Sequence, residues 1–358
     1  MNIDQTNLSA EQRVVAIQRL TALWAFSESG LGGIMHALRI PFTGLVVGGM
    51  SVIMISFIAQ LCEGRYREIL KSALIVLIIK AMVSPYTPFP AYVAVSFQAL
   101  SGFVLFSLLR INFGSILLLS VIAMLESAIQ QLLILTLFFG QSIWKALDAF
   151  VIFVSKQFGA IAINGSQWMI AIYLLIYIVG GIAVAWMGWK TLADFSSGKF
   201  SEFSTNEVLI GNVPLTNTRN KKNNTRKLWM IFSLLVAFSV ILFFVAANTK
   251  QGWINVIKTV SWTLSAVMLW YMLINPLFTK LIKRVLLKKE SRYSEEISRT
   301  LAFLPVLRQL AALAWRKSRL GKGGSRWYIF LSELIHSSLT YNEDSGKAAT
   351  VAPFKKTA

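Results

Sequence analysis

Ionisable and amide side chains recur inside the apolar segments of this chain, where charge is costly to keep. A carboxylate at the centre of a membrane helix costs roughly 2.5–3.5 kcal/mol on insertion scales, so such residues usually mark a binding site or a pathway. The candidate substrate-binding residues are Glu28, His36, Lys80, Tyr86, Tyr92, Gln98, Glu126 and Gln130. A pocket that combines an acid, bases, amides and aromatic walls suits a small polar or zwitterionic organic molecule.

The same residues also have purely structural interpretations, which the sequence leaves open. Glu28 and Lys80 could form an ion pair that only joins two helices, and His36 could anchor a helix end at the membrane surface. Glu126 and Gln130 lie one turn apart and can hydrogen-bond neighbouring helices, at about 0.6 kcal/mol per bond. The tyrosines suit the aromatic belt where a bilayer meets water.

Catalysis has little support in the motifs. The chain has no H-E-x-x-H, G-x-S-x-G or phosphate-loop sequence, and its two histidines, His36 and His336, lie near opposite ends. Cys62 is the only cysteine, which excludes an intramolecular disulfide and a cysteine-rich metal site. We therefore expect no enzyme activity, no catalytic residue, no metal and no cofactor. One enzymatic alternative remains, a membrane enzyme for a lipid-linked substrate with Glu28 or Glu126 as general acid or base.

The composition is that of a polytopic membrane protein. Of 358 residues, 55% are hydrophobic and only 14% are charged, with a mean hydropathy of +0.61, whereas soluble domains carry about 25% charged residues. The net charge of +19 does not indicate nucleic-acid binding, because Lys and Arg concentrate between apolar segments and in the tail, as the positive-inside rule expects. Membrane lipids are the expected partners. The polar N-terminus does not have the pattern of a cleavable signal peptide.

Apolar segments near the ~20 residues that a bilayer requires predict an all-α protein with eight spans. The expected spans are residues 15–37, 42–61, 68–84, 91–109, 113–139, 168–189, 229–248 and 257–279. The basic residues between spans mostly share one side if both termini are cytoplasmic. Ser9 and Gln12 resemble a capping box that opens the first helix. Residues 142–165 alternate aromatic and charged side chains, which favours an amphipathic helix on the outer surface, with a long loop as the alternative.

Changes in composition divide the chain into four segments. A six-span module covers residues 1–192, a basic cytosolic linker 193–227, a two-span appendix 228–284 and a basic cytosolic tail 285–358. Ile297, Leu301, Leu304, Leu307 and Leu310 recur at helical spacing within the tail, and a last short helix is expected around residues 327–334. These amphipathic helices are expected to lie on the anionic inner leaflet or to dock a partner.

Small residues at Ala25, Ser29 and Gly33 recur every fourth position on the first span, which allows another backbone to approach closely. The chain combines this stripe with the sequences IPFTGLVVGG and SPYTPFPAYVAVSFQAL and with the expected six spans. In these features, residues of about 10–192 resemble the substrate-binding S components of energy-coupling factor (ECF) transporters. Members of that family are bundles of six helices that capture vitamins and trace nutrients at the outer face of the bacterial inner membrane.

The resemblance implies that Ala25, Ser29 and Gly33 dock a transmembrane coupling subunit. It also implies that ATPase subunits encoded elsewhere supply the energy. The candidate residues above would then line a pocket that opens outward, and the turn between the third and fourth spans would close over it. We therefore expect a substrate-capturing subunit of a vitamin or other nutrient transporter. The alternative outside this class, besides the enzyme, is a membrane scaffold that recruits a cytosolic partner.

Overall fold

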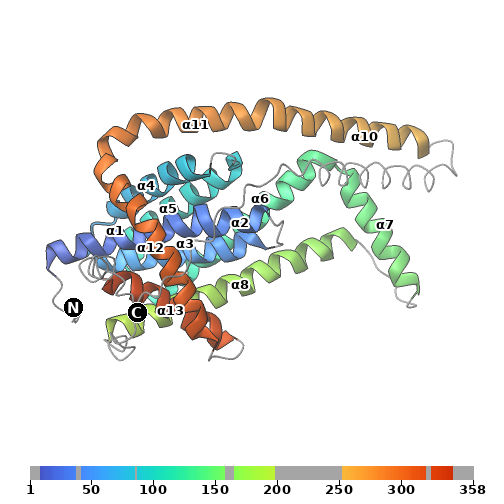
Figure 1. Ribbon diagram of the computed structural model, residues 1–358. Helices are drawn as coiled ribbons and strands as arrows, with labels where there is room; N and C mark the ends of the chain where they lie inside the picture. Colours follow the sequence, from blue (N-terminus) through green and yellow to red (C-terminus); the bar gives the residue numbers. More distant parts are fainter. Residues whose placement is uncertain are drawn as a thin grey trace, which may run out of the picture. The chain divides into compact units, whose positions relative to one another are not determined.

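The computed structural model describes residues 9–37, 42–84, 87–157, 165–197, 252–319 and 324–341, and all regular structure within these ranges is helical (Figure 1). The all-α prediction is therefore confirmed. The elements are α1 (Ala10–Phe26), η2 (Ser27–Leu31), α2 (Gly32–Ala37), α3 (Thr43–Leu61), α4 (Arg67–Val83), α5 (Phe89–Leu109), α6 (Phe113–Phe139), α7 (Ser142–Gln157), α8 (Gly165–Ser196), α10 (Gly252–Leu269), η4 (Trp270–Ile274), α11 (Asn275–Glu290), η5 (Ser291–Tyr293), α12 (Ser294–Ser318) and α13 (Gly324–Thr340).

Within the described residues, five helices are long and apolar enough to cross a membrane by length and composition. They are Thr43–Leu61, Phe89–Leu109, Phe113–Phe139, Gly165–Ser196 and a continuous run over Ile257–Ser318. They indicate a membrane-embedded protein. Of the other expected spans, 15–37 is divided into three consecutive elements, 68–84 corresponds to the 17-residue α4, and 229–248 lies outside the described residues. The six-helix bundle of an S component and the orientation of the termini stay predictions.

The chain forms two compact units. The first comprises Met1–Gln130, Ile170–Ile210 and Leu277–Ala358, and the second comprises Gln131–Met169 and Gly211–Pro276. The candidate binding residues all belong to the first unit. The expected basic tail also belongs to it.

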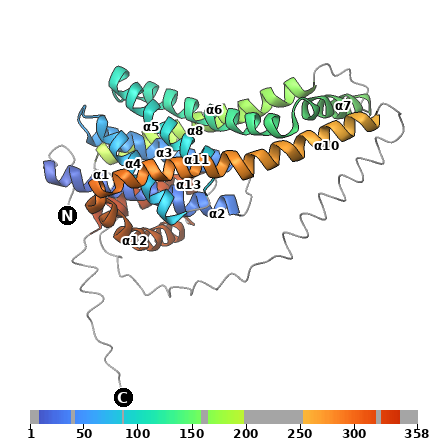
Figure 2. The same cartoon turned by 90° about the horizontal axis from the view of Figure 1, so that it is seen from above.

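Helix α3 is the central element of the first unit, in contact with α1, α4 and α5 (Figures 1 and 2). Of the 18 most apolar consecutive residues of α3, 72% are buried. This is because α3 carries apolar side chains on every face rather than in one stripe. Phe57, Ile55 and Ile58 are fully buried there together with Trp24 of α1. Gly102 of α5 lets that helix approach α3 closely, since an added Cβ would lie 2.6 Å from Cγ2 of Ile55.

The helices of the expected tail pack onto the end of this bundle. The repeat that begins at Ile297 forms α12 and the last helix is α13, so both helix predictions are confirmed. Leu307, Leu310 and Ile335 are buried in the same core as α1 and α4. Arg19 of α1 donates to the carbonyl of Leu339 across 2.7 Å. Figures 1 and 2 both show α12 beside α1.

The second unit contains the expected amphipathic helix. It is α7, which has no buried side chain, and its placement on the outer surface stays a prediction. Oδ1 of Asp148 accepts the backbone N–H of Ser166 at 2.7 Å, and this bond lowers the pKa of the Asp148 carboxyl. Between α7 and α10, the hydroxyls of Ser142 and Thr259 lie 3.0 Å apart.

Candidate functional site

Glu28 lies in a single turn of π-helix, η2, between α1 and α2. In this turn the backbone N–H of Gly32 donates to the carbonyl of Ser27, five residues back. Because a π-turn inserts an extra residue, it rotates the following residues relative to α-helical spacing, and such turns are frequent at functional sites. The carboxylate of Glu28 is thereby held inside the bundle, where its side chain is only 4% exposed.

The structure pairs Glu28 with Lys80 of α4. Nζ of Lys80 lies 2.6 Å from Oε2 of Glu28, and the Lys80 side chain is 6% exposed. The second carboxylate oxygen, Oε1, accepts from the Ser51 hydroxyl at 2.6 Å, and Nε1 of Trp24 donates to that hydroxyl at 2.9 Å. Three elements besides η2 thus contribute one polar group each to a connected network.

This network offsets the cost of burying two charges. The attraction between two buried ions offsets their loss of hydration only where the two charged groups are in direct contact and their remaining polar atoms are hydrogen-bonded. Both oxygens of Glu28 have partners here, so the pair joins η2 to α4 firmly. The structural interpretation of Glu28 and Lys80 as an ion pair therefore describes their contact correctly. The contact by itself does not require a substrate.

Gln98 of α5 is a different case, because it is buried at 2% exposure and its Oε1 has no hydrogen-bond partner in the described part of the chain. Its amide nitrogen faces Gly48 of α3, where an added Cβ would lie 3.1 Å from Nε2. A buried acceptor without a partner costs about 1–3 kcal/mol. Such a group within a folded protein calls for a specific explanation.

Glu126 of α6 directly precedes Ser127, which faces the same part of α3. Its Oε2 is also buried without a hydrogen-bond partner among the described residues. The next residue, Ser127, faces α3 at Gly44 and Gly48, because an added Cβ at Gly44 would lie 3.1 Å from Cβ of Ser127. The two glycines therefore bring α3 close to the polar side chains of α5 and α6.

One face of α3 connects these groups. Positions 44, 47, 48 and 51 follow the i, i+3, i+4, i+7 spacing of a single helical face. At one end of this face Ser51 bonds Glu28, and at the other end Gly44 and Gly48 meet Ser127 and Gln98. We call Glu28, Ser51, Lys80 and Gln98, together with Glu126 next to Ser127 on α6, the α3 polar site.

The other predicted binding residues occupy varied positions. Tyr92 is buried at 1% exposure on α5, and Nε2 of Gln130 donates to the carbonyl of Pro90 at 3.0 Å, which joins α6 to the start of α5. His36 belongs to α2, but its side chain, like the whole of Tyr86, lies outside the described residues.

The predicted docking stripe lies largely inside the chain. Ala25 is fully buried and Ser29 is 8% exposed, whereas an added Cβ at Gly33 would meet nothing within 4 Å. Since η2 contains Ser29, the π-turn interrupts the α-helical spacing on which the stripe was predicted. The hydroxyls of Ser27 and Ser29 are buried and without a hydrogen-bond partner within the described ranges.

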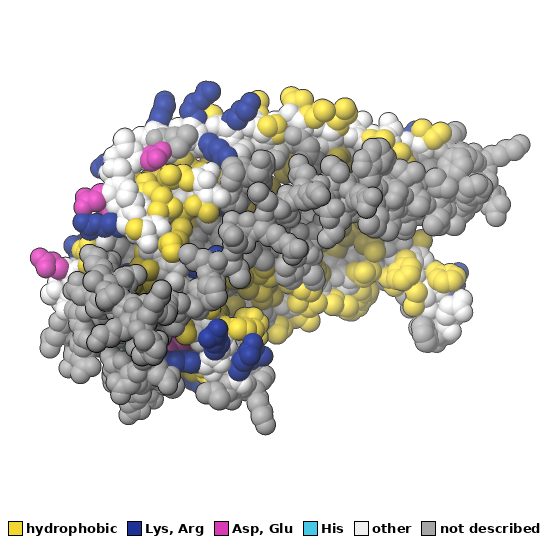
Figure 3. Space-filling model, in the orientation of Figure 1, with side chains coloured by type: hydrophobic (Ala, Val, Ile, Leu, Met, Phe, Trp, Pro, Cys, Tyr) yellow, Lys and Arg dark blue, Asp and Glu magenta, His cyan; other side chains and the backbone are white. Residues whose placement is uncertain are grey.

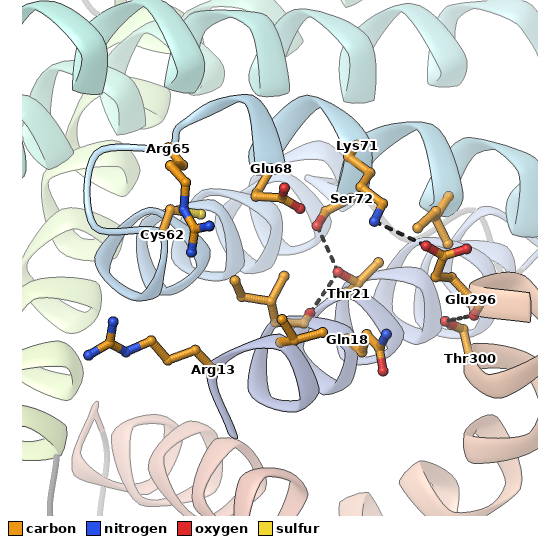
Figure 4. A pocket seen from close by; sticks show the side chains of 13 residues that line it. Arg13, Gln18, Thr21, Cys62, Arg65, Glu68, Lys71, Ser72, Glu296 and Thr300 are labelled. Carbon is orange, nitrogen blue, oxygen red and sulfur yellow. Dashed lines mark hydrogen bonds and ion pairs between the residues drawn. The ribbon is translucent and has the colours of Figure 1, made fainter. Parts of the chain in front are cut away.

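A second polar region lies where α1, α4 and α12 meet (Figure 4). It is a cavity of about 130 Å³ whose lining includes Arg65, Glu68 and Cys62. Lys71 and Glu296 close one side of it with an ion pair at 3.0 Å. Burial raises the pKa of the Cys62 thiol to about 12, with Glu68 adding to the rise and Arg65 opposing it. The cavity is therefore lined by both cations and anions, and its thiol is unreactive at neutral pH.

Ser51 was missed in the sequence, although it bonds both Trp24 and Glu28. Serine as a residue type in an apolar helix does not indicate a contact with another helix. Ser56 of the same helix, for example, donates only to the Val52 carbonyl of its own helix among the bonds described, at 2.8 Å. The signal that could have found Ser51 is its position one turn after Val47, on the face that begins with Gly44 and Gly48.

Comparison of the chain with protein-family profiles, curated proteins and solved structures finds no match.

Proposed function

We propose that this protein is a substrate-capturing membrane subunit of a transporter for a small polar organic nutrient, such as a vitamin. The observation that carries the proposal is Oε1 of Gln98, a buried acceptor that has no hydrogen-bond partner among the described residues. The amide of Gln98 packs against the face of α3 that also carries Ser51, the partner of Glu28. A substrate hydrogen-bond donor would satisfy this acceptor, and a second donor would satisfy Oε2 of Glu126. Each such bond would recover the cost of burying an acceptor without a partner.

The proposed division of labour follows from the bonds of each group. Glu28 and Lys80 are already paired, so they would set the electrostatic potential near the site and hold η2 against α4. Gln98 and Glu126 retain bonding capacity and would contact the substrate. Gly44 and Gly48 keep α3 close to Gln98 and to Ser127, the residue after Glu126. In this proposal the segment that joins α4 to α5 would move aside to admit the substrate, as in a site that closes over its substrate.

The chain has no recognisable phosphate-binding loop, so uphill transport would depend on an ion gradient or on separate ATPase and transmembrane coupling subunits. Residence in the bacterial cytoplasmic membrane with both termini inside belongs to the same proposal. The resemblance of residues of about 10–192 to S components supports it.

Ligand retention tests the proposal. The full chain is purified in a mild detergent, and its thermal unfolding is measured with each member of a panel of water-soluble vitamins. Bound substrate is expected to raise the unfolding temperature in proportion to the logarithm of its concentration above Kd. If no compound of the panel shifts unfolding and denatured protein releases no small molecule detectable by mass spectrometry, the transporter proposal is wrong.

The scaffold alternative is favoured by one specific observation, the mutual satisfaction of Glu28 and Lys80. A scaffold needs these residues only for stability. A scaffold would therefore bind no compound of the vitamin panel, which distinguishes it from the transporter.

A further inference from the structure

Exposed tryptophans lie next to cations where α8 ends and where α12 meets α13. Trp186 and Lys190 lie on α8, Trp315 and Arg316 on α12, and Arg326 and Trp327 on α13. We call these six residues the tryptophan–cation surface; all belong to the first unit. Figure 3 shows Lys and Arg side chains bordering hydrophobic ones in the region where Figure 1 places α13.

Helix α8 sets the depth of this surface in a membrane. Its apolar side chains are exposed at Ile172, Leu175 and Val179, each 56%, and at Ile182, 48%. Trp186, which is 54% exposed, follows one turn later, about 6 Å further along the axis, and Lys190 lies another ~6 Å beyond. Apolar side chains followed by Trp and then Lys are the usual order from hydrocarbon to headgroups.

Contacts hold α13 at the same level as the end of α8. Nζ of Lys190 lies 4.3 Å from the ring centroid of Tyr328 and 5.3 Å from that of Trp186. The Tyr328 hydroxyl donates to the carboxylate of Asp194, and burial together with this bond raises the pKa of Tyr328 to about 12. The first turns of α13 therefore lie beside the part of α8 that runs from Trp186 to Asp194.

The junction of α12 and α13 is aromatic and positively charged. The rings of Trp315 and Trp327 lie 5.8 Å apart, and the guanidinium carbon of Arg326 lies 4.4 Å from the centroid of Trp315. Trp315 is 37% and Trp327 is 52% exposed, and Arg316 is exposed beside them. Exposed indoles are costly in water but favourable in the interfacial region of a bilayer.

We infer that the tryptophan–cation surface inserts into the headgroup layer around α8 and binds anionic phospholipid. The two indoles of the junction would lie at the level of the lipid carbonyls, and the exposed Lys190 and Arg316 would meet the phosphates. Two observations select lipid as the occupant. The surface is continuous with the exposed apolar face of α8, and its cations complement an anionic leaflet. This inference does not depend on the proposed transport function.

The experiment uses the full chain in vesicles of phosphatidylcholine with an increasing share of phosphatidylglycerol. The variant Trp315→Phe/Trp327→Phe keeps aromatic side chains, and its fluorescence subtracted from that of the wild type isolates the two indoles. The expected difference signal is quenched by lipids brominated near the headgroup end of the acyl chain and is protected from aqueous acrylamide. Quenching by acrylamide with no effect of brominated lipid would overturn the inference and leave the surface to a soluble partner.

A charge variant tests the recognition of anionic lipid. Removal of one interfacial cation by Arg316→Gln is expected to raise the share of phosphatidylglycerol needed for half-maximal quenching roughly five-fold. Arg299→Gln is the matched control, because Arg299 is an exposed cation of the same helix that pairs with Glu295 at 2.5 Å. Equal shifts in the two variants, or no shift in either, would contradict recognition of anionic lipid at this surface.

Discussion

Glu28 and Lys80, 52 residues apart in the sequence, meet at 2.6 Å in the interior of the first unit. Their contact fixes the π-turn η2 against α4 and, through Ser51, against α3. The pair and its Ser51 partner therefore connect η2, α3 and α4.

Replacement of Lys80 by Met leaves the Glu28 carboxylate buried without its cation. Loss of one partner of a buried ion pair typically costs about 3–5 kcal/mol, so Lys80→Met is expected to lower the unfolding temperature strongly. Thermal or denaturant unfolding of the purified protein in detergent measures the effect. Lys71→Met is the matched control, because Lys71 pairs with Glu296 while 38% of its side chain is exposed.

The double variant Glu28→Gln/Lys80→Met removes both charges. Because a buried pair and its uncharged replacement often differ little in stability, the double variant is expected to regain most of the stability lost in Lys80→Met. A double variant no more stable than the single one would show that the two side chains do not act as a pair.

Close helix packing predicts opposite effects of one substitution at two glycines. Gly102→Ala places a methyl group 2.6 Å from Cγ2 of Ile55, and overpacking of this kind typically costs about 1–3 kcal/mol. Gly33→Ala meets nothing within 4 Å, so it is expected to be neutral or to stabilise helix α2 by up to about 1 kcal/mol. Equal unfolding temperatures for the two variants would argue against the contact between α3 and α5.

The helix positions were largely predictable from the sequence. The expected segments 42–61 and 113–139 match α3 (Thr43–Leu61) and α6 (Phe113–Phe139) closely, because long apolar runs bounded by turn residues leave few alternatives. The capping box is also confirmed, since Ser9 and Gln12 bond reciprocally. These features depend on local sequence alone.

The missed features depend on contacts between distant segments. No local pattern indicates that α12 packs on α1, or that the face of α3 with Ser51 is the one that meets Glu28. The π-turn at Ser27–Leu31 was missed because the prediction of the small-residue stripe at Ala25, Ser29 and Gly33 assumed 3.6 residues per turn throughout. The approach of Gln98 to α3 was missed because it depends on the absence of a side chain at Gly48.

Cys62 provides a reporter of unfolding. It is 1% exposed, and because burial raises its pKa to about 12, the thiol stays protonated at neutral pH. Maleimide is therefore expected to label the folded protein very slowly and the denatured protein completely, as mass spectrometry would measure. Rapid labelling of the folded protein would contradict the packing of α3 against its neighbours. Because Cys62 is the only cysteine of the chain, all maleimide labelling reports on this one site.

His336 predicts a loss of stability in mild acid. Burial, and to a smaller extent Lys317, lowers the pKa of His336 below its usual 6.5, against the opposing influence of Glu333. The unfolded chain therefore binds a proton at a pH where the folded chain does not. The contribution of His336 to stability is complete above pH 6.5 and is lost as the pH falls through the folded-state pKa.

The variant His336→Phe removes this titration. Its unfolding temperature is expected to fall less than that of the wild type between about pH 7.5 and about pH 5.5. Identical pH profiles for the two proteins would show that another group governs the acid sensitivity.

The most direct test of the account is the effect of Gln98→Leu on ligand-induced stabilisation. The comparison uses whichever nutrient raises the unfolding temperature of the wild type, with Gln131→Leu as control because Gln131 is an exposed glutamine on α6. The account predicts that Gln98→Leu folds with at least wild-type stability, since it removes a buried acceptor without a partner in the described structure, yet loses the ligand-induced shift that Gln131→Leu retains. An undiminished shift in Gln98→Leu would contradict the claim that the α3 polar site binds the substrate.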